Sequence, residues 1–207
     1  MLDVYKIRED FPILGKKVNN TDLIYFDNAA TSQTPNQVID VISSYYKENN
    51  SNIHRGLHSL SADATNKYEN SRSIIKNHFG AAHEHEIIFT SGTTHGINIV
   101  SSGLEKFISS KDELIVSEME HHSNIVPWQM LCEKTGSKLK VIPINDDGTL
   151  DMDEYKSLLT NQVKFVFINH VSNTLGIVNP IKEIVDLAHK NKSKVLIDGA
   201  QGAAHFK

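Results

Sequence analysis

The sequence Lys194-Val195-Leu196-Ile197-Asp198-Gly199-Ala200-Gln201 contains a short apolar run that ends in a carboxylate and small residues. A continuous run of apolar and β-branched residues is typical of a strand that is covered on both faces of a sheet. Similar runs occur at residues 86–90, 113–117, 139–143 and 163–168. Stretches with a helical spacing of apolar residues alternate with them, at about residues 36–49, 60–79, 94–109, 123–135, 151–160 and 180–192. This alternation predicts an α/β fold.

Composition limits the classes of protein to which the chain can belong. It has 207 residues, of which 39% are hydrophobic and 22% charged, and a formal net charge of -4. This acidic balance argues against a nucleic-acid-binding protein, which needs a basic surface. No apolar run approaches the roughly 18 residues that span a membrane, and the acidic start lacks the apolar segment of a signal peptide. The single cysteine, Cys132, excludes an internal disulfide, so we expect a cytoplasmic protein.

Polar or small residues follow four of the five predicted strands, and in open α/β sheets ligands bind at the carboxyl ends of the strands. The first cluster, residues 90–94, precedes a predicted helix, where open backbone N–H groups and hydroxyls favour an anion such as phosphate. The second, residues 117–124, holds His121 and His122, which can offer a ring to stack on a ligand. The third, residues 169–176, is rich in amides and hydroxyls that can fix the polar edge of a ligand.

Each cluster also has a purely structural interpretation. Residues 90–94 suit an ordinary helix N-cap, and residues 169–176 suit a plain turn. Asp198 suits a turn or a helix cap as well. Histidines are usually structural or exposed, and adjacent histidines rarely chelate one ion, so the sequence predicts no metal site.

Asp198 is the sharpest of these candidates because it stands at the mouth of a predicted buried strand. Burying a carboxylate there costs free energy unless a cation or strong hydrogen-bond donors lie beside it. A protonated heterocyclic nitrogen would be such a partner. The small residues Gly199 and Ala200 let a flat group approach, and Gln201 can donate a hydrogen bond to it. A phosphate cradle, a stacking ring and an acid for a ring nitrogen together describe pyridoxal 5′-phosphate (PLP).

With these residues in place, the chain resembles the class V aminotransferase family, and within it the cysteine desulfurases of the sulfur-mobilisation (SufS-like) branch. The matching segments run in family order along nearly the whole chain; they are Tyr25-Phe26-Asp27-Asn28-Ala29-Ala30, Asn52-Ile53-His54-Arg55-Gly56-Leu57-His58, Phe89-Thr90-Ser91-Gly92-Thr93-Thr94, Glu118-Met119-Glu120-His121-His122-Ser123-Asn124-Ile125-Val126-Pro127-Trp128, His170-Val171-Ser172-Asn173-Thr174-Leu175-Gly176 and Asp198-Gly199-Ala200-Gln201. The fourth segment is especially distinctive of this branch. The resemblance implies the large domain of a three-layer PLP-dependent transferase of fold type I, with a mostly parallel sheet.

The resemblance also implies roles for single residues. Thr93 and Thr94 would hold the phosphate of PLP through backbone and hydroxyl groups, and the His121 ring would stack on the pyridine ring. Asp198 would pair with the ring nitrogen and so make the cofactor an electron sink. His121 and Asp198 are thus the predicted catalytic residues.

Other implied contacts surround the same cofactor. Gln201 would donate to its phenolic oxygen, and Asn173 would lie beside the cofactor and the substrate carboxylate. Where the family usually has glutamate after the two threonines, this chain has His95, which we interpret as a peripheral change.

Earlier segments of the chain match family segments near the substrate or the dimer interface. The residues concerned are Asn28, Ala29, His54 and Arg55. We expect residues 1–20 to form an N-terminal arm or short helix, and residues 21–207 to form a PLP-binding large domain that is incomplete at its C-terminus.

Several parts of the family pattern are missing from the sequence. The lysine that holds PLP as a Schiff base should follow in a Ser-x-His-Lys pattern beyond Gln201, and Lys207 is not in that pattern. The arginine for the substrate carboxylate, the loop cysteine that receives sulfur and the small C-terminal domain are also expected further along. Cys132 lies in the predicted helix 123–135, and we interpret it as a core or neutral surface residue rather than as the nucleophile. We therefore expect an N-terminal fragment that is inactive alone.

The resemblance implies that the full-length parent is a cysteine desulfurase, which converts L-cysteine to L-alanine. An enzyme thiolate would take the sulfur as a persulfide and pass it to an acceptor protein for iron–sulfur cluster assembly, and the parent would be a homodimer. Two alternatives stay open. In the first, the full-length parent would be a selenocysteine lyase or another class V PLP enzyme. In the second, the chain would be a non-catalytic scaffold or a cofactor-binding fragment.

Overall fold

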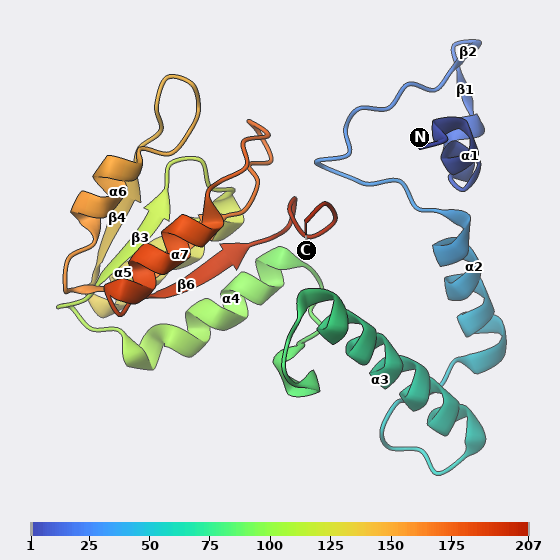
Figure 1. Ribbon diagram of the computed structural model, residues 1–207. Coiled ribbons are helices and arrows are strands. Elements are labelled where there is room, and N and C mark those ends of the chain that lie inside the picture. The colour runs from blue at the N-terminus through green and yellow to red at the C-terminus, as the bar shows by residue number, and fades with distance from the viewer. Residues whose placement is uncertain (1, 207) are drawn as a thin grey trace. The chain divides into compact units, whose positions relative to one another are not determined.

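The computed structural model describes residues 2–206. The chain divides into two compact units, one extending to Ile88 and the other beginning at Phe89 (Figure 1). The expected division into an arm over residues 1–20 and a PLP-binding domain over residues 21–207 stays a prediction.

The first unit begins with short elements that bury no side chains. These are α1 (Val4–Glu9), a 3-10 turn at Pro12–Gly15, and the two-residue strands β1 (Lys17–Val18) and β2 (Thr21–Asp22), which pair antiparallel. Asp3 caps α1, because its side chain accepts a hydrogen bond from the Lys6 backbone N–H at 3.1 Å. Since these elements bury no side chains, they contribute nothing to a core.

Two longer helices complete the first unit. α2 (Asn36–Ser44) continues into a π-helical turn at Tyr45–Asn49, so the predicted helix 36–49 is confirmed in extent, with a change of helix type near its end. α3 (Ser59–Phe79) ends at Gly80, whose φ of 67° is the left-handed conformation that glycine adopts without strain.

The second unit contains a four-stranded parallel sheet. The strand order is β4 (Lys138–Ile142), β3 (Glu113–Ser117), β5 (Val163–Asn169) and β6 (Lys194–Asp198). β3 is buried along its whole length, as its continuous apolar run predicts. The predicted α/β fold with a mostly parallel sheet is therefore confirmed.

Helices cover both faces of this sheet and make three layers (Figure 1). α6 (Met152–Leu158) and α7 (Ile181–Lys190) pack on one face. α4 (Thr93–Leu104), which ends in a 3-10 turn at Glu105–Phe107, and α5 (Val126–Thr135) pack on the other. The helices predicted in this part of the chain are thus confirmed, with shifts at their ends.

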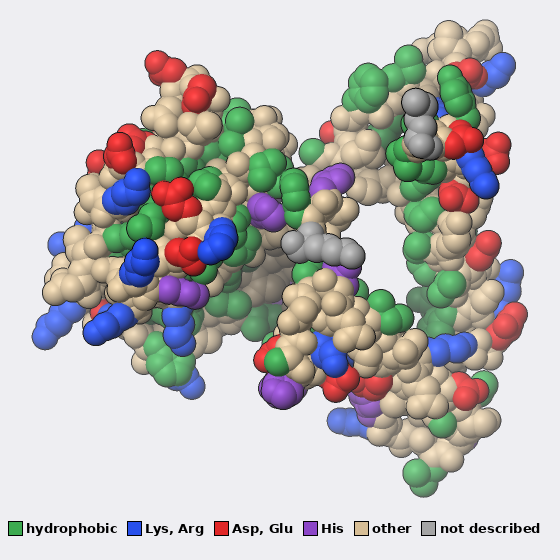
Figure 2. Space-filling model, in the orientation of Figure 1, with side chains coloured by type: hydrophobic (Ala, Val, Ile, Leu, Met, Phe, Trp, Pro, Cys, Tyr) green, Lys and Arg blue, Asp and Glu red, His purple; other side chains and the backbone are tan. Residues whose placement is uncertain are grey.

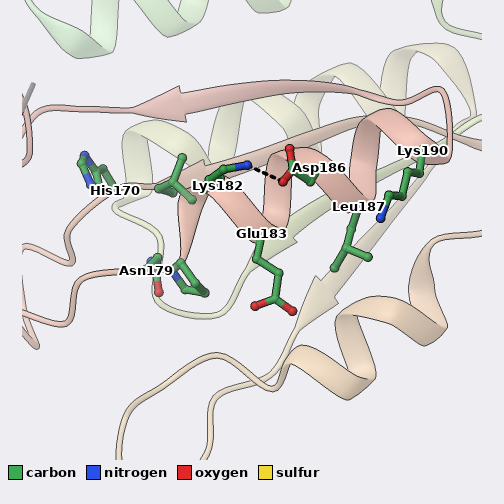
Figure 3. A pocket seen from close by; sticks show the side chains of 9 residues that line it. His170, Asn179, Lys182, Glu183, Asp186, Leu187 and Lys190 are labelled. Atoms are coloured by element: carbon green, nitrogen blue, oxygen red, sulfur yellow. Dashed lines mark hydrogen bonds and ion pairs between the residues drawn. The ribbon is translucent and has the colours of Figure 1, made fainter.

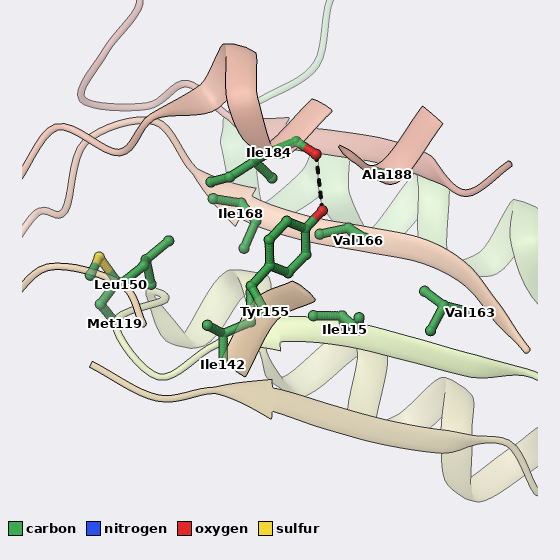
Figure 4. Close-up of a cluster of buried hydrophobic side chains, with 10 residues drawn as sticks. All are labelled: Ile115, Met119, Ile142, Leu150, Tyr155, Val163, Val166, Ile168, Ile184 and Ala188. Atoms are coloured by element: carbon green, nitrogen blue, oxygen red, sulfur yellow. Dashed lines mark hydrogen bonds between the residues drawn. The ribbon is translucent and has the colours of Figure 1, made fainter. Parts of the chain in front are cut away.

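Alternate residues of a strand point to opposite faces, so the sheet divides the core in two. One cluster gathers Ile115, Val166 and Ile168 around Tyr155 of α6 (Figure 4). The Tyr155 hydroxyl donates to the backbone carbonyl of Ile184 in α7 at 2.9 Å, which satisfies this buried polar group.

The other cluster is centred on Trp128 of α5. Its ring stacks on Phe167 of β5, with ring centroids 3.6 Å apart and planes 10° from parallel. Cys132 belongs to this cluster, and burial raises the pKa of its thiol. Of the two interpretations of Cys132, a core residue or a neutral surface residue, the structure supports the first.

The predicted strand at residues 86–90 is wrong. Glu86 ends a 3-10 turn (Glu84–Glu86), residues 87–90 form no strand, and Ile88 is 72% exposed. A strand needs a neighbour for its backbone hydrogen bonds, and the four strands of the sheet take their partners from one another. The apolar, β-branched residues of this run favour an extended conformation, but they do not determine whether a partner strand lies beside it.

The surface carries charges of both signs. Acidic and basic side chains are interspersed over the second unit on the face shown in Figure 2. Within residues 2–206, no helix has both the length and the apolar character of a membrane span.

Replacing Tyr155 by phenylalanine removes one buried hydrogen bond and leaves the ring packed. We expect the free energy of unfolding to fall by about 1 kcal/mol, because one net intramolecular hydrogen bond contributes that much. The urea midpoint should fall with an unchanged slope. Tyr46→Phe is the matched control, because Tyr46 is 69% exposed, and it should leave the midpoint in place. Equal midpoints for Tyr155→Phe and the unchanged protein would contradict the prediction.

Candidate active site

Three of the four predicted polar clusters lie at the carboxyl ends of neighbouring strands. They follow β3, β5 and β6, and because these strands are parallel and adjacent, their ends meet at one edge of the sheet. The register places Asn169, the last residue of β5, beside Asp198, the last residue of β6. This edge is the candidate active site.

The first cluster, residues 90–94, leads into α4 instead of ending a strand. Gly92 precedes the helix with a φ of 136°, a conformation that essentially only glycine adopts without strain. Thr93 and Thr94 are the first two residues of α4 and are exposed, and α4 contacts the 3-10 turn His122–Asn124 that follows β3. The N–H groups of a first helical turn have no partners within the helix, so with two hydroxyls beside them they can bind an anion.

His95 belongs to the structure of the same turn. Its Nδ1 atom accepts a hydrogen bond from the Ser91 backbone N–H at 3.3 Å and lies 2.9 Å from the Ser91 hydroxyl. The ring therefore ties the first turn of α4 to the loop that precedes it.

His121 stands directly before the 3-10 turn and is exposed. Its Nδ1 atom accepts a hydrogen bond from the Ser123 backbone N–H at 3.1 Å and lies 2.8 Å from the Ser123 hydroxyl. A nitrogen that accepts a hydrogen bond carries no proton, so the neutral ring has its proton on Nε2. The contacts with Ser123 hold the Nδ1 side of the ring in place, and the exposed side chain stays accessible to a ligand.

Asp198 is 6% exposed, and its Oδ1 atom accepts a hydrogen bond from the Ala200 backbone N–H at 2.9 Å. Within the described part of the chain, no basic side chain forms an ion pair with its carboxylate. A Cβ added at Gly199 would meet its nearest neighbour only at 3.9 Å, so the backbone beside Asp198 is not crowded. A buried carboxylate in this situation suits a cationic, flat partner.

Asn173 and Gln201 lie in the loops that leave the same edge. Asn173 is exposed in a loop that is closed by a bridge between Val171 and Val178, and Gln201 is half-buried in the turn after β6. The loop of Asn173 is shaped by Ser172, whose hydroxyl accepts a hydrogen bond from the Leu175 backbone N–H at 3.1 Å.

The remaining predicted residues, Asn28, Ala29, His54 and Arg55, lie in the first unit, and their role beside the substrate or the dimer interface stays a prediction. His54 has a φ of 67° and its Nε2 atom lies 2.7 Å from Glu69 Oε1. The hydrogen bonds from His54 and Arg72 lower the pKa of Glu69, so this histidine is held in place by α3.

Sequence reasoning missed a buried polar network at the sheet edge. Glu120 is 8% exposed, and its Oε1 atom accepts hydrogen bonds from the Ser117 hydroxyl at 2.5 Å and the Asn169 backbone N–H at 2.9 Å. Its Oε2 atom accepts from Asn124 Nδ2 at 2.7 Å. Asn124 Oδ1 accepts in turn from Trp128 Nε1 at 2.9 Å, so both ends of this amide are engaged.

Two asparagines extend the network behind β5. Asn169 Nδ2 donates to the Met119 carbonyl at 3.0 Å, and Asn179 Nδ2 donates to Asn169 Oδ1 at 2.6 Å. Asn179 Oδ1 is buried and has no partner among residues 2–206. The signal in the sequence was the polar residue Asn169 at the end of an apolar strand, because a buried amide must be hydrogen bonded.

The electrostatics of Glu120 and Asp198 are linked. Burial, and to a lesser extent the negative charge of Asp198, raise the pKa of Glu120 to about 7 against the opposing effect of its three hydrogen bonds. Two carboxyl groups at one buried edge favour a cationic ligand there, because a positive charge relieves their repulsion.

A surface hollow of about 740 Å³ lies along α7 (Figure 3). Lys182 Nζ and Asp186 Oδ2 lie 2.7 Å apart on its wall, so these opposite charges neutralise each other. The hollow includes His170 and Asn179 but none of the residues predicted to hold a ligand. In the described residues, no group of three or more histidine, cysteine or acidic side chains is arranged to bind a metal ion.

Comparison with known proteins places this geometry in a family. The family model described as aminotransferase class-V matches residues 24–207. A cysteine desulfurase of Synechococcus elongatus is 46% identical over 205 residues, which cover 99% of this chain and 33% of that protein. A cysteine desulfurase of Shigella sonnei is 46% identical over 203 residues, covering 98% of this chain and 50% of that protein.

A solved structure agrees in fold over the same length. The apo form of a cysteine desulfurase from Thermococcus onnurineus NA1 has a TM-score of 0.91 at 37% identity, covering 99% of this chain and 49% of that one. The chain therefore spans between one third and about half of the length of these relatives.

The raised pKa of Glu120 predicts how stability depends on pH. Between pH 4.5 and about 7 the folded state holds a proton on Glu120 that the unfolded state has lost, so stability falls as the pH rises through this range. The full fall is about 3 kcal/mol. Glu120→Gln removes the titration, so the difference in unfolding free energy between the unchanged protein and this variant should decline across the range.

Urea unfolding of both proteins at several pH values measures this difference in unfolding free energy. The contributions of titrating groups that the two proteins share cancel in it. A difference that stays constant from pH 4.5 to 8 would show that Glu120 titrates normally in the folded state.

Proposed function

Because the chain belongs to the class V aminotransferase family, we propose that the complete protein is a PLP-dependent cysteine desulfurase. Its similarity to cysteine desulfurases along nearly its whole length supports this activity. The structural observation that carries the proposal is the buried carboxylate of Asp198, which stands at the carboxyl edge of a parallel sheet with no basic partner among the described residues.

The residues at this edge fit PLP group by group. Thr93, Thr94 and the first turn of α4 hold the phosphate, as the anion-binding character of a helix N-terminus supports. The accessible ring of His121 stacks on the pyridine ring. Asp198 keeps the ring nitrogen protonated by offering it a buried negative charge.

When bound, PLP supplies an electron sink for the bond that breaks at the α-carbon of an amino acid. The chain's own residues prepare that step. Asn173 and Gln201 lie in loops at the same edge, where an amide can orient the substrate carboxylate and another can donate to the phenolic oxygen. His121 covers one face of the ring and limits the access of water to it.

The substrate and partners follow from the same activity. L-cysteine is the sulfur donor, L-alanine is the product, and a sulfur-acceptor protein takes the sulfur for iron–sulfur cluster assembly. The complete protein acts in the cytoplasm as a homodimer, in which Asn28, Ala29, His54 and Arg55 lie near the substrate or the interface. This chain matches about half of the length of two of these relatives. By the family resemblance, the lysine that binds PLP and the cysteine that receives sulfur would lie further along the complete protein.

The gene sequence after Lys207 and an assay of the complete gene product test this proposal together. We expect an open frame with a Ser-x-His-Lys pattern, and release of L-alanine from L-cysteine in the presence of PLP. Faster turnover of L-selenocysteine than of L-cysteine would identify a selenocysteine lyase instead. A frame that stops at Lys207, with no PLP binding by its product, would support the non-catalytic alternative.

Asp198→Ala tests the role of the buried carboxylate in the complete protein. We expect PLP to stay bound through its phosphate while alanine production falls about 100-fold or more, because the ring nitrogen loses the charge that keeps it protonated. Asp186→Ala is the matched control, since Asp186 is an exposed carboxylate paired with Lys182 on α7. Turnover of Asp198→Ala close to that of the control would refute the assignment.

A further inference from the structure

The loop that carries His121 is joined to the sheet through one buried side chain. Glu120 reaches β5 through the hydrogen bond from the Asn169 backbone N–H at 2.9 Å, and it reaches its own loop through the hydrogen bond from Asn124 at 2.7 Å. His121 is the next residue in the chain, and Asn169 pairs in register with Asp198. One carboxylate therefore connects the two segments that carry the proposed ligands of the pyridine ring.

The surroundings of Glu120 require an acceptor with two oxygens. The backbone N–H of Asn169 can only donate. The Asn124 amide is oriented by Trp128, whose indole N–H donates to Asn124 Oδ1, so its NH2 group faces Glu120. The Ser117 hydroxyl adapts to either role. Above its pKa of about 7, the Glu120 side chain is a carboxylate, which offers two acceptors and no donor. The variants are therefore compared above that pH.

We propose that Glu120 is a positioning residue that sets where the His121 ring stands relative to Asp198. The inference rests on the proposed binding of PLP at this edge and deepens it. Glu120 is 8% exposed and its oxygens are engaged by protein donors, so it acts through the His121 backbone and the end of β5. Glu118 in the same loop is a contrast, because it is exposed and accepts only a long hydrogen bond, 3.3 Å, from the Ile144 backbone N–H.

The His121 ring reports on this anchoring without any ligand. Its Nδ1 atom accepts from the Ser123 backbone N–H at 3.1 Å, so its tautomer depends on the shape of the turn that Glu120 holds. Nitrogen-15 NMR of histidine-labelled apoprotein therefore detects displacement of the turn through the two ring nitrogens of His121.

Two single variants break the arrangement in opposite ways. Glu120→Gln places an amide NH2 group against the NH2 group of Asn124, and Asn124→Asp places a second carboxylate against Glu120. The double variant Glu120→Gln/Asn124→Asp restores every hydrogen bond and moves the negative charge from position 120 to position 124. In it, the carboxylate introduced at position 124 accepts both from the amide introduced at position 120 and from the Trp128 indole N–H.

We expect each single variant, made in the complete gene product, to weaken PLP binding about tenfold or more and to change the His121 nitrogen signals of the apoprotein. The double variant should recover the signals and most of the affinity. Glu118→Gln is the matched control and should change neither.

A folded Glu120→Gln protein with unchanged His121 signals and unchanged PLP affinity would overturn the inference, as would a variant that loses only stability. If Glu120→Gln does not fold, Ser117→Ala takes its place, because it removes one of the three donors to Glu120. We expect this variant to shift the His121 signals by a smaller amount than Asn124→Asp does. Unchanged His121 signals in Ser117→Ala would again overturn the inference. If the unchanged protein binds no PLP while the single variants shift the signals and the double variant restores them, the proposed function falls and the positioning role stands.

Discussion

Parallel pairing on both sides of β5 is the constraint on which the second unit depends. β5 is hydrogen bonded to β3 and β6, so three strand ends meet at one edge without any contribution from long side chains. The ladder does not stop cleanly at this edge. β3 ends at Ser117, and the next N–H of β5 that needs an acceptor, that of Asn169, is taken by the carboxylate of Glu120. The site therefore begins where side chains replace backbone carbonyls as acceptors.

The two ends of the proposed ligand meet environments of different character. Asp198, together with Glu120 above the pKa of that residue, places negative charge at the buried end of the strands, while the first turn of α4 offers open N–H groups at the positive end of a helix. A molecule with a cationic ring nitrogen and an anionic phosphate matches both features, whereas a simple anion or a simple cation matches only one. This pairing of charges is a stronger argument for PLP than either feature alone.

Local patterns predicted most of the fold, and non-local contacts account for the rest. The strands that became β3, β5 and β6 are continuous apolar runs whose character is readable from adjacent residues. Residues 86–90 have the same character but form no strand, because pairing depends on a neighbour that the run itself does not encode. Asp198 was predictable from the cost of a carboxylate at a strand end. Glu120 was not, because the N–H that it accepts belongs to Asn169, 49 residues away.

Trp128 gives the molecule an optical property that follows from its packing. It is the single tryptophan of the sequence, its indole stacks on Phe167, and its N–H is joined through Asn124 to Glu120. All ultraviolet emission from tryptophan thus originates in the second unit, at a ring that is fully buried and two hydrogen bonds from the candidate site. Tryptophan fluorescence of this chain, excited selectively over that of its tyrosines, is therefore a local signal, which reports on the sheet, its covering helix and the site edge.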